Sequence, residues 1–210
     1  MDKVFGTHRE ALQEALGIYR DIGDRRGQAN ALSALGKVRR HTGDYRGAVE
    51  AQQEALGIYR DIGSRLGQAG VLMYLGVVRR VTGDYRGAGE ALQEALVIYR
   101  LIGDRGGEAE ALNEAGTIHR LRGDPGQAGM YHQRALDRAR EITSPRDEAH
   151  ALAGLGRCAL ADGRAADAIA RLRQPRDIFQ RIGAPEADDV AAELGGLPGA
   201  GPAPGSTRES

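Results

Sequence analysis

The chain has 210 residues, and its 29 basic residues equal its 29 acidic ones, so no net field favours nucleic acid or an anionic membrane as a partner. A single cysteine, Cys158, excludes an intramolecular disulfide and is typical of a reducing compartment. No window approaches the roughly 20 apolar residues that span a bilayer, and the polar N-terminus predicts no signal peptide, so a cytoplasmic protein is expected.

A ten-residue segment is repeated along the chain at a fixed spacing. Residues 14–23 recur without change as residues 54–63, and residues 94–103 differ from them only at Val97 and Leu101. The spacing is 40 residues each time. A fixed period of this size is typical of a stacked-repeat protein, in which each unit packs mainly on its neighbours.

Residues 6–22 are predicted to form the first amphipathic helix, because apolar residues such as Leu12 and Leu16 recur on one face. Gly23 can adopt the left-handed conformation that ends a helix, and Asp24 can cap the next one. No helix of the repeat pattern precedes this one, so its apolar face is predicted to be uncovered. We expect either that the chain derives from a longer protein or that this face supports self-association.

Four complete helix pairs are expected after the first helix, at about residues 25–62, 65–102, 105–142 and 145–182. A terminal helix is expected at residues 185–194, which completes a predicted repeat domain over residues 1–194. Residues 195–210 have no periodicity and are rich in Gly and Pro, which predicts a disordered tail. Pro175 lies inside the last long helix, so that helix is expected to be kinked or broken there.

Glycine recurs inside the first helix of every pair, at Gly36, Gly76, Gly116 and Gly156. Glycine in a helix interior costs about 1 kcal/mol relative to alanine, so we expect a close helix crossing at each position. The turn Thr42-Gly43-Asp44-Tyr45 returns as residues 82–85. The turn between the third and fourth pairs is rebuilt as Thr143-Ser144-Pro145, which predicts a cap followed by proline at the first helical position.

Four segments of the first pair, Leu35-Gly36, Gly43-Asp44-Tyr45, Ala48 and Ala55-Leu56, have an order and spacing that resembles the tetratricopeptide repeat (TPR). The resemblance covers roughly residues 6–182. The period exceeds the usual period of about 34 residues, as in a long-helix subtype of adaptor and scaffold proteins and of bacterial signalling ATPases and transcriptional regulators. The resemblance implies an all-α, right-handed superhelical solenoid of antiparallel helix pairs.

In the TPR family the first helix of each pair lines a concave groove that binds a peptide or protein segment. Matching positions of this sequence imply the groove residues Asn30, Ser33, Lys37, Arg40, Gly70, Met73, Val77, Arg80, Glu110, Asn113, Thr117, Arg120, His150, Ala153, Arg157 and Leu160. Chaperone-binding members clamp carboxylates with paired Lys and Asn, a pattern that Ser33 and Lys37 do not match. We expect partner specificity to come from the positions that vary between copies.

Arginine recurs at one groove position, as Arg40, Arg80 and Arg120. Two interpretations remain open. The arginines could form a ladder of planar donors for the acidic groups of a bound peptide. Alternatively, an arginine near a helix C-terminus complements the helix dipole and was copied with the repeat.

No motif of catalysis or metal binding is present, so the sequence predicts no cofactor and no enzymatic activity. The histidines have no Cys or carboxylate partner at metal-ligand spacing. Cys158 has no general base beside it and is expected to be a small buried residue. Tyr19, Tyr59 and Tyr99 recur on the apolar face, which favours core packing over base stacking.

The predicted function is therefore a non-catalytic protein–protein interaction scaffold that binds a peptide or protein segment in its groove. The alternative is a regulatory or sensor TPR module of a larger bacterial signalling ATPase or transcriptional regulator.

Overall fold

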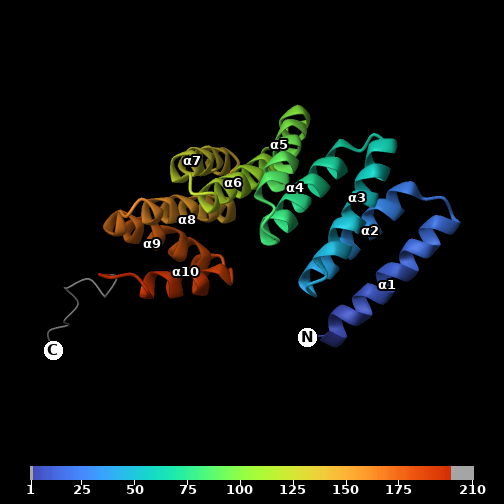
Figure 1. Cartoon of the computed structure of the whole chain (residues 1–210), viewed down its shortest axis with the longest axis horizontal. Coiled ribbons are helices and arrows are strands. Elements are labelled where there is room, and N and C mark those ends of the chain that lie inside the picture. Colours follow the sequence, from blue (N-terminus) through green and yellow to red (C-terminus); the bar gives the residue numbers. More distant parts are fainter. Residues whose placement is uncertain (1, 200–210) are drawn as a thin grey trace. The chain divides into compact units, whose positions relative to one another are not determined.

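The computed structural model describes residues 2–199, and their secondary structure is entirely helical (Figure 1). The helices are α1 (Asp2–Asp21), α2 (Arg25–His41), α3 (Tyr45–Asp61), α4 (Arg65–Val81), α5 (Tyr85–Ile102), α6 (Arg105–Leu121), α7 (Pro125–Glu141), α8 (Pro145–Ala161), α9 (Ala165–Arg181) and α10 (Glu186–Gly195). The predicted all-α solenoid class, built from repeating helices, is confirmed.

The helices fall into two compact units, and the boundary lies inside α6, between Glu114 and Ala115. In the first unit α1 packs on α2, α2 on α3, α3 on α4 and α4 on α5. In the second unit α7 packs on α8, α8 on α9 and α9 on α10. Each unit is therefore a stack of sequential helices, and one continuous repeat domain over residues 1–194 stays a prediction.

The turn between two helices combines a left-handed glycine with an aspartate cap. Gly43 has a φ of 81°, and the Asp44 carboxylate accepts a hydrogen bond of 2.9 Å from the backbone N–H of Gly47. This bond satisfies one of the N–H groups that a helix start leaves without a partner. The same cap recurs at Asp24, Asp84 and Asp104.

The turn before α8 departs from this pattern, as its sequence predicted. Ser144 is the N-cap and Pro145 occupies the first helical turn, so the predicted cap and proline are confirmed. Thr143 stands where the other turns of this type have glycine, and its φ is 54°. Among the described residues it is the only non-glycine residue with positive φ. A β-branched residue in this conformation is strained.

The recurring helix-interior glycines lie at close helix crossings, as predicted. Each faces one side chain of the following helix, in the pairs Gly36–Gln52, Gly76–Leu92, Gly116–His132 and Gly156–Leu172. A Cβ on Gly76 would lie 2.7 Å from Cγ of Leu92. Real Cβ atoms do not approach a neighbour so closely, so any side chain at this position would push the two helices apart.

Of the two outcomes expected at Pro175, a kink or a break, the break is excluded, because α9 runs unbroken from Ala165 to Arg181. Pro175 is fully buried, in a helix that packs on both α8 and α10. Packing of the surrounding turns thus holds the helix together despite the backbone hydrogen bond that proline cannot make. A kink at this position stays a prediction.

The two ends of the chain also differ from expectation. Helix α1 begins at Asp2 and not at residue 6. Beyond α10, residues 196–199 form turns, and Leu197 packs against the core cluster that includes Phe179 and Val190. The disordered tail therefore does not begin at residue 195, and the rest of that predicted tail, residues 200–210, lies outside the described residues.

Among the described residues, no helix is both long enough and apolar enough to cross a membrane.

Candidate functional site

A small pocket lies between the first helices of two successive pairs, α2 and α4, and has a volume of about 220 Å³. Its lining residues are Ser33, Lys37, Tyr59, Gly67, Gly70, Val71, Met73 and Tyr74. Four of these, Ser33, Lys37, Gly70 and Met73, are positions that the family resemblance implied for the groove. The structure therefore brings part of the expected groove together in one place, which we call the α2–α4 pocket.

The α2–α4 pocket is open at Gly70. A Cβ added at Gly70 would meet no atom within 4 Å, so the space beside this residue is unoccupied by other side chains. The matching positions of the other pairs hold Asn30, Glu110 and His150, which all carry longer side chains. The missing side chain at Gly70 thus distinguishes the second pair from its neighbours and leaves room for an inserted group.

Two polar groups of the α2–α4 pocket differ in whether a ligand can bind them: the hydroxyl of Tyr59 is already hydrogen-bonded, and the ammonium of Lys37 is available. The hydroxyl of Tyr59 donates a hydrogen bond of 2.6 Å to Oδ1 of Asn30, and burial raises the pKa of Tyr59, so this hydroxyl stays neutral. Lys37 is exposed, and within the described part of the chain it makes no ion pair or side-chain hydrogen bond. The pocket therefore combines the apolar groups of Val71 and Met73 with one available ammonium group.

The arginines that recur on the first helices have partners inside the protein. Arg40 donates from Nε to the hydroxyl of Tyr74 at 2.9 Å, and its guanidinium lies 5.7 Å from the centre of the Tyr74 ring. Arg80 donates from Nε to Oε2 of Glu114, also at 2.9 Å. In both cases the partner stands 34 residues later, on the first helix of the next pair. These two arginines therefore link successive helix pairs through Nε, and each has an internal partner.

Arg120 breaks the pattern of the other two arginines. The residue 34 positions after it is Gly154, which has no side chain to offer. Arg120 is half-buried, and it makes no hydrogen bond or ion pair with any described residue. A Cβ at Gly154 would overlap the imidazole of His132, so that ring occupies the space beside Gly154. Of the three recurring arginines, Arg120 is thus the one with no partner among residues 2–199.

His132 is a buried histidine that faces positive charge. Burial lowers its pKa from 6.5 to about 4, and the nearby charges of Arg120 and Arg157 act in the same direction. The matching positions of the other pairs hold Gln52, Leu92 and Leu172. His132 is thus neutral at physiological pH and serves as a packing residue at the crossing with Gly116.

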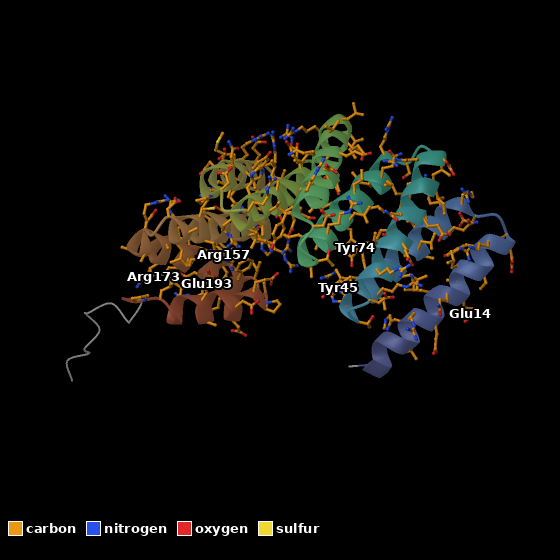
Figure 2. All side chains as sticks on the ribbon, in the orientation of Figure 1. Glu14, Tyr45, Tyr74, Arg157, Arg173 and Glu193 are labelled. Atoms are coloured by element: carbon orange, nitrogen blue, oxygen red, sulfur yellow. The ribbon has the colours of Figure 1, made fainter. Side chains whose placement is uncertain are left out.

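Helix α10 covers the expected groove positions of the fourth pair. Arg157 of α8 pairs with Glu193 of α10 at 2.9 Å, and Figure 2 shows the two side chains between these helices. His150 stacks edge-on against Phe179 and lies 3.6 Å from Glu186. Ala153 has no exposed surface and belongs to the core, so its expected place in an open groove is wrong.

The remaining expected groove positions do not gather into the α2–α4 pocket. Glu110 is exposed, and the partly buried positions are Val77, Asn113, Thr117 and Leu160. Specificity at these positions stays a prediction.

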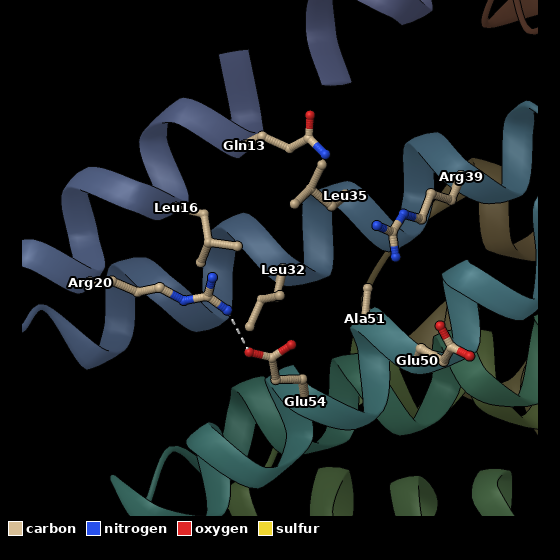
Figure 3. Close-up of a pocket in the computed structure, with 9 residues that line it drawn as sticks. All are labelled: Gln13, Leu16, Arg20, Leu32, Leu35, Arg39, Glu50, Ala51 and Glu54. Atoms are coloured by element: carbon tan, nitrogen blue, oxygen red, sulfur yellow. Dashed lines mark hydrogen bonds and ion pairs between the residues drawn. The ribbon is translucent and has the colours of Figure 1, made fainter. Parts of the chain in front are cut away.

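A second kind of cavity occurs twice in the first unit. One, of about 450 Å³, lies where α1, α2 and α3 meet, and the ion pair between Arg20 and Glu54 closes part of its rim (Figure 3). The other, of about 340 Å³, is lined by the residues 40 positions later, where Arg60 pairs with Glu94. Because these rim charges are paired within the chain, both cavities are repeated packing features.

Cys158 and the potential metal ligands lie as follows in the described residues. Within them, no group of three His, Cys, Asp or Glu side chains lies close enough to hold a metal ion. Cys158 is 4% exposed, and burial raises the pKa of its thiol, as expected for a packing residue. Tyr59 and Tyr99 are buried, which confirms the predicted core role for these two tyrosines.

A protein-family model described as tetratricopeptide repeat matches residues 9–61, 67–141 and 107–181. The chain belongs to the tetratricopeptide repeat family. The matched segments include α2 and α4 and therefore the α2–α4 pocket of this TPR protein. No curated protein matches the sequence of this chain significantly.

Solved structures resemble this TPR chain in fold at low sequence identity. BtubC (BKLC) from P. vanneervenii has a TM-score of 0.67 and 16% identity, over 98% of this chain and 96% of that one. A Rap protein complexed with Competence and Sporulation Factor has a TM-score of 0.73 and 13% identity, over 92% of this chain and 59% of that one. A STAND signal-transduction ATPase with a TPR sensor, from Pyrococcus horikoshii, has a TM-score of 0.66 and 18% identity, over 87% of this chain and 32% of that one.

The TPR pattern alone did not predict that Tyr74 and Glu114 are the partners of Arg40 and Arg80. The signal lies in the position that holds Ala34, Tyr74, Glu114 and Gly154 in the four pairs. Comparing the arginine position with this one across units would have paired Arg40 with Tyr74 and Arg80 with Glu114. It would also have shown that Arg120 has no partner there.

Proposed function

We propose that this TPR protein is a non-catalytic interaction scaffold that binds a segment of another protein across α2 and α4. One apolar side chain of that segment inserts beside Gly70, and an acidic group approaches the ammonium of Lys37. Val71 and Met73 supply apolar surface for the inserted side chain.

The observation that carries the proposal is the combination of an open space with an available charge. Gly70 leaves room for a side chain, and Lys37 has no carboxylate partner among the described residues. A volume of about 220 Å³ is smaller than the roughly 300–1,000 Å³ of a typical small-molecule site, so the pocket suits one inserted side chain of a larger partner. The surrounding helices are already packed, so binding needs little reorganisation of the scaffold.

A Rap protein of similar fold has been solved with Competence and Sporulation Factor bound, which supports a ligand-binding role for this arrangement of helices. The identity of 13% means that the likeness concerns the fold, and the binding chemistry has to come from the residues of this chain.

A phage-displayed library of random 12-residue peptides tests the proposal. Peptides selected on the wild-type protein are then measured with Gly70→Asn, which places in the pocket the residue that stands at the matching position 30. The matched control is Gly57→Asn, because Gly57 is an exposed glycine of α3 at which an added Cβ would also meet no atom within 4 Å. We expect Gly70→Asn to weaken binding at least tenfold and Gly57→Asn to leave it unchanged. Equal affinity of both variants would contradict the proposal.

We infer a second candidate role, a regulatory or sensor module that self-associates through α1. The likeness to a STAND ATPase with a TPR sensor supports a regulatory role. The specific observation is that Ile18 of α1 is 53% exposed, whereas the matching residues Ile58 and Ile98 are 6% exposed. Helix α1 thus exposes a face that its copies, α3 and α5, keep covered.

Sedimentation velocity tests this second role. Wild-type protein is expected to dimerise with rising concentration, and Ile18→Glu is expected to stay monomeric. Val97→Glu is the control, because Val97 is 63% exposed on α5 in a position unrelated to the α1 face. A monomeric wild-type protein at all concentrations would rule this role out.

A further inference from the structure

One of the recurring arginines on the first helices shows how a carboxylate can bind at this position of the repeat. Nε of Arg80, in the second pair, donates a hydrogen bond of 2.9 Å to the carboxylate of Glu114, in the third pair. The two side chains are 24% and 28% exposed, so the pair is partly shielded from water. A charge-assisted bond in such a place is stronger than a fully exposed ion pair.

The next copy of the repeat lacks this carboxylate, and it differs from the second copy at two positions that lie against each other. Where the second pair has Leu92 and the following unit has Glu114, the third pair has His132 and the following unit has Gly154. The ring of His132 fills the space in which a Cβ of residue 154 would lie. An internal side chain therefore cannot reach Arg120 from position 154 while His132 is present.

The charges around Arg120 do not replace the missing carboxylate. Arg157 is the other arginine close enough to affect His132, and its guanidinium is bound to Glu193 through Nε at 3.0 Å and Nη2 at 2.9 Å. His132 itself is buried. Arg120 is thus half-buried at a position set by the repeat, and no carboxylate of the described residues binds its guanidinium.

We propose that Arg120 is a docking site for a carboxylate group of a protein segment, which takes the place that Glu114 takes on Arg80. This inference rests on the proposed scaffold function for its source of ligand. The carboxylate is either an Asp or Glu side chain or the C-terminus of the partner segment, since both present the same two oxygens to a guanidinium.

A direct measurement needs no knowledge of the partner. Arginine Nε–H signals of ¹⁵N-labelled protein are followed by NMR during titration with N-acetylglutamate α-amide, which has a single carboxylate. We expect the Arg120 signal to shift in a saturable way and the Arg80 signal to stay in place. Arg173 is the control for non-specific ion effects, because it is exposed and has no ion pair or hydrogen bond among the described residues (Figure 2). No shift at Arg120, or an equal shift at Arg173, would overturn the inference.

A variant that rebuilds the internal ligand provides the second test. The double variant His132→Leu/Gly154→Glu recreates the Leu92 and Glu114 arrangement beside Arg120 and is expected to abolish the shift. His132→Leu alone is expected to keep it, because position 154 still lacks a carboxylate. A persisting shift in the double variant would contradict the assignment.

Peptide binding separates this inference from the scaffold proposal. For peptides selected on the Gly70→Asn variant, in which the α2–α4 pocket is filled, Arg120→Gln is expected to reduce affinity roughly tenfold. Replacing the peptide's Glu with Gln, or its C-terminal acid with an amide, shows which carboxylate is involved, since only that change has no further effect in Arg120→Gln. If Gly70→Asn weakens binding but Arg120→Gln does not, the scaffold stands and this inference fails. If no peptide binds, the scaffold proposal fails and the NMR titration alone decides the inference.

Discussion

Arg80 donates a hydrogen bond of 2.9 Å to the carboxylate of Glu114, which stands 34 residues later on the next first helix. The same geometry joins Arg40 to the hydroxyl of Tyr74. The donor position holds arginine in the first three helix pairs and Leu160 in the fourth, while the accepting position changes chemically from pair to pair. This division separates the residues that build the stack from those that distinguish one unit from another.

His132 makes the stability of the protein sensitive to acid. Its pKa of about 4 in the folded protein lies below the value of 6.5 expected when unfolded. The unfolded chain therefore binds a proton between these values that the folded protein does not, and stability falls as the pH drops from about 6.5 towards 4. Urea unfolding at a series of pH values should show a loss on the order of 2–3 kcal/mol from this group.

The matched variant for this experiment is His132→Leu, because Leu92 and Leu172 occupy the matching positions against Gly76 and Gly156. The variant should lose the part of the acid sensitivity that belongs to His132, while the titration of carboxylates remains. Parallel stability curves for wild type and variant between pH 7 and pH 4.5 would show that His132 does not titrate as its burial implies.

Thr143 is a position where a single substitution should stabilise the fold. Its φ of 54° is strained for a β-branched residue, and glycine occupies the matching turns at Gly23, Gly63 and Gly103. Thr143→Gly should raise the free energy of unfolding by about 1 kcal/mol, since relief of strain exceeds the entropy cost of glycine. Thermal unfolding measures the change.

The control is Thr82→Gly, because Thr82 has a φ of −86° and its hydroxyl donates to the carbonyl of Arg79 at 3.1 Å. This variant should be less stable than wild type, since it loses a hydrogen bond and gains chain entropy without relieving strain. A stabilising effect in both variants would mean that the conformation of Thr143 is not the cause.

The crossing at Gly76 predicts opposite effects for two similar substitutions. Gly76→Ala places a methyl group against Leu92 and should lower stability by about 1–3 kcal/mol. Gly57→Ala adds the same methyl group to an open surface of α3 and should raise stability by about 1 kcal/mol. Chemical denaturation of both variants tests the crossing, which would be refuted by stabilisation at Gly76.

Cys158 should react slowly with thiol reagents in the folded protein. Its burial excludes the reagent and raises the pKa of the thiol, so little thiolate forms at neutral pH. Reaction with a chromogenic disulfide reagent should proceed much more slowly in buffer than in denaturant. Equal rates would show that the side chain is accessible in the native state.

The sequence predicted the helices well because their boundaries depend on local chemistry. Left-handed glycines such as Gly43 and caps such as Asp44 are encoded within a few residues of each turn. The close crossings were predictable for the same reason, since a glycine such as Gly76 in the middle of a helix carries a cost that needs a packing explanation.

The contents of the groove were less predictable because they depend on contacts between units. The interpretation of Arg40 and Arg80 as free donors did not consider the residue 34 positions later, which binds each of them. Ala153 was expected in an open groove, but α10 covers that part of α8, and this packing is not encoded by the 40-residue pattern. The α2–α4 pocket likewise could not be predicted from the repeat pattern, because one of its lining residues, Tyr59, comes from a third helix, α3.

The proposed scaffold function is tested most directly by the affinity of selected peptides for Gly70→Asn and Gly57→Asn. Both variants add the same side chain to an exposed or open position of a helix, but only the first fills the α2–α4 pocket. We predict that Gly70→Asn weakens peptide binding at least tenfold while Gly57→Asn binds like wild type. Wild-type affinity in Gly70→Asn, in a correctly folded protein, would contradict the proposed function.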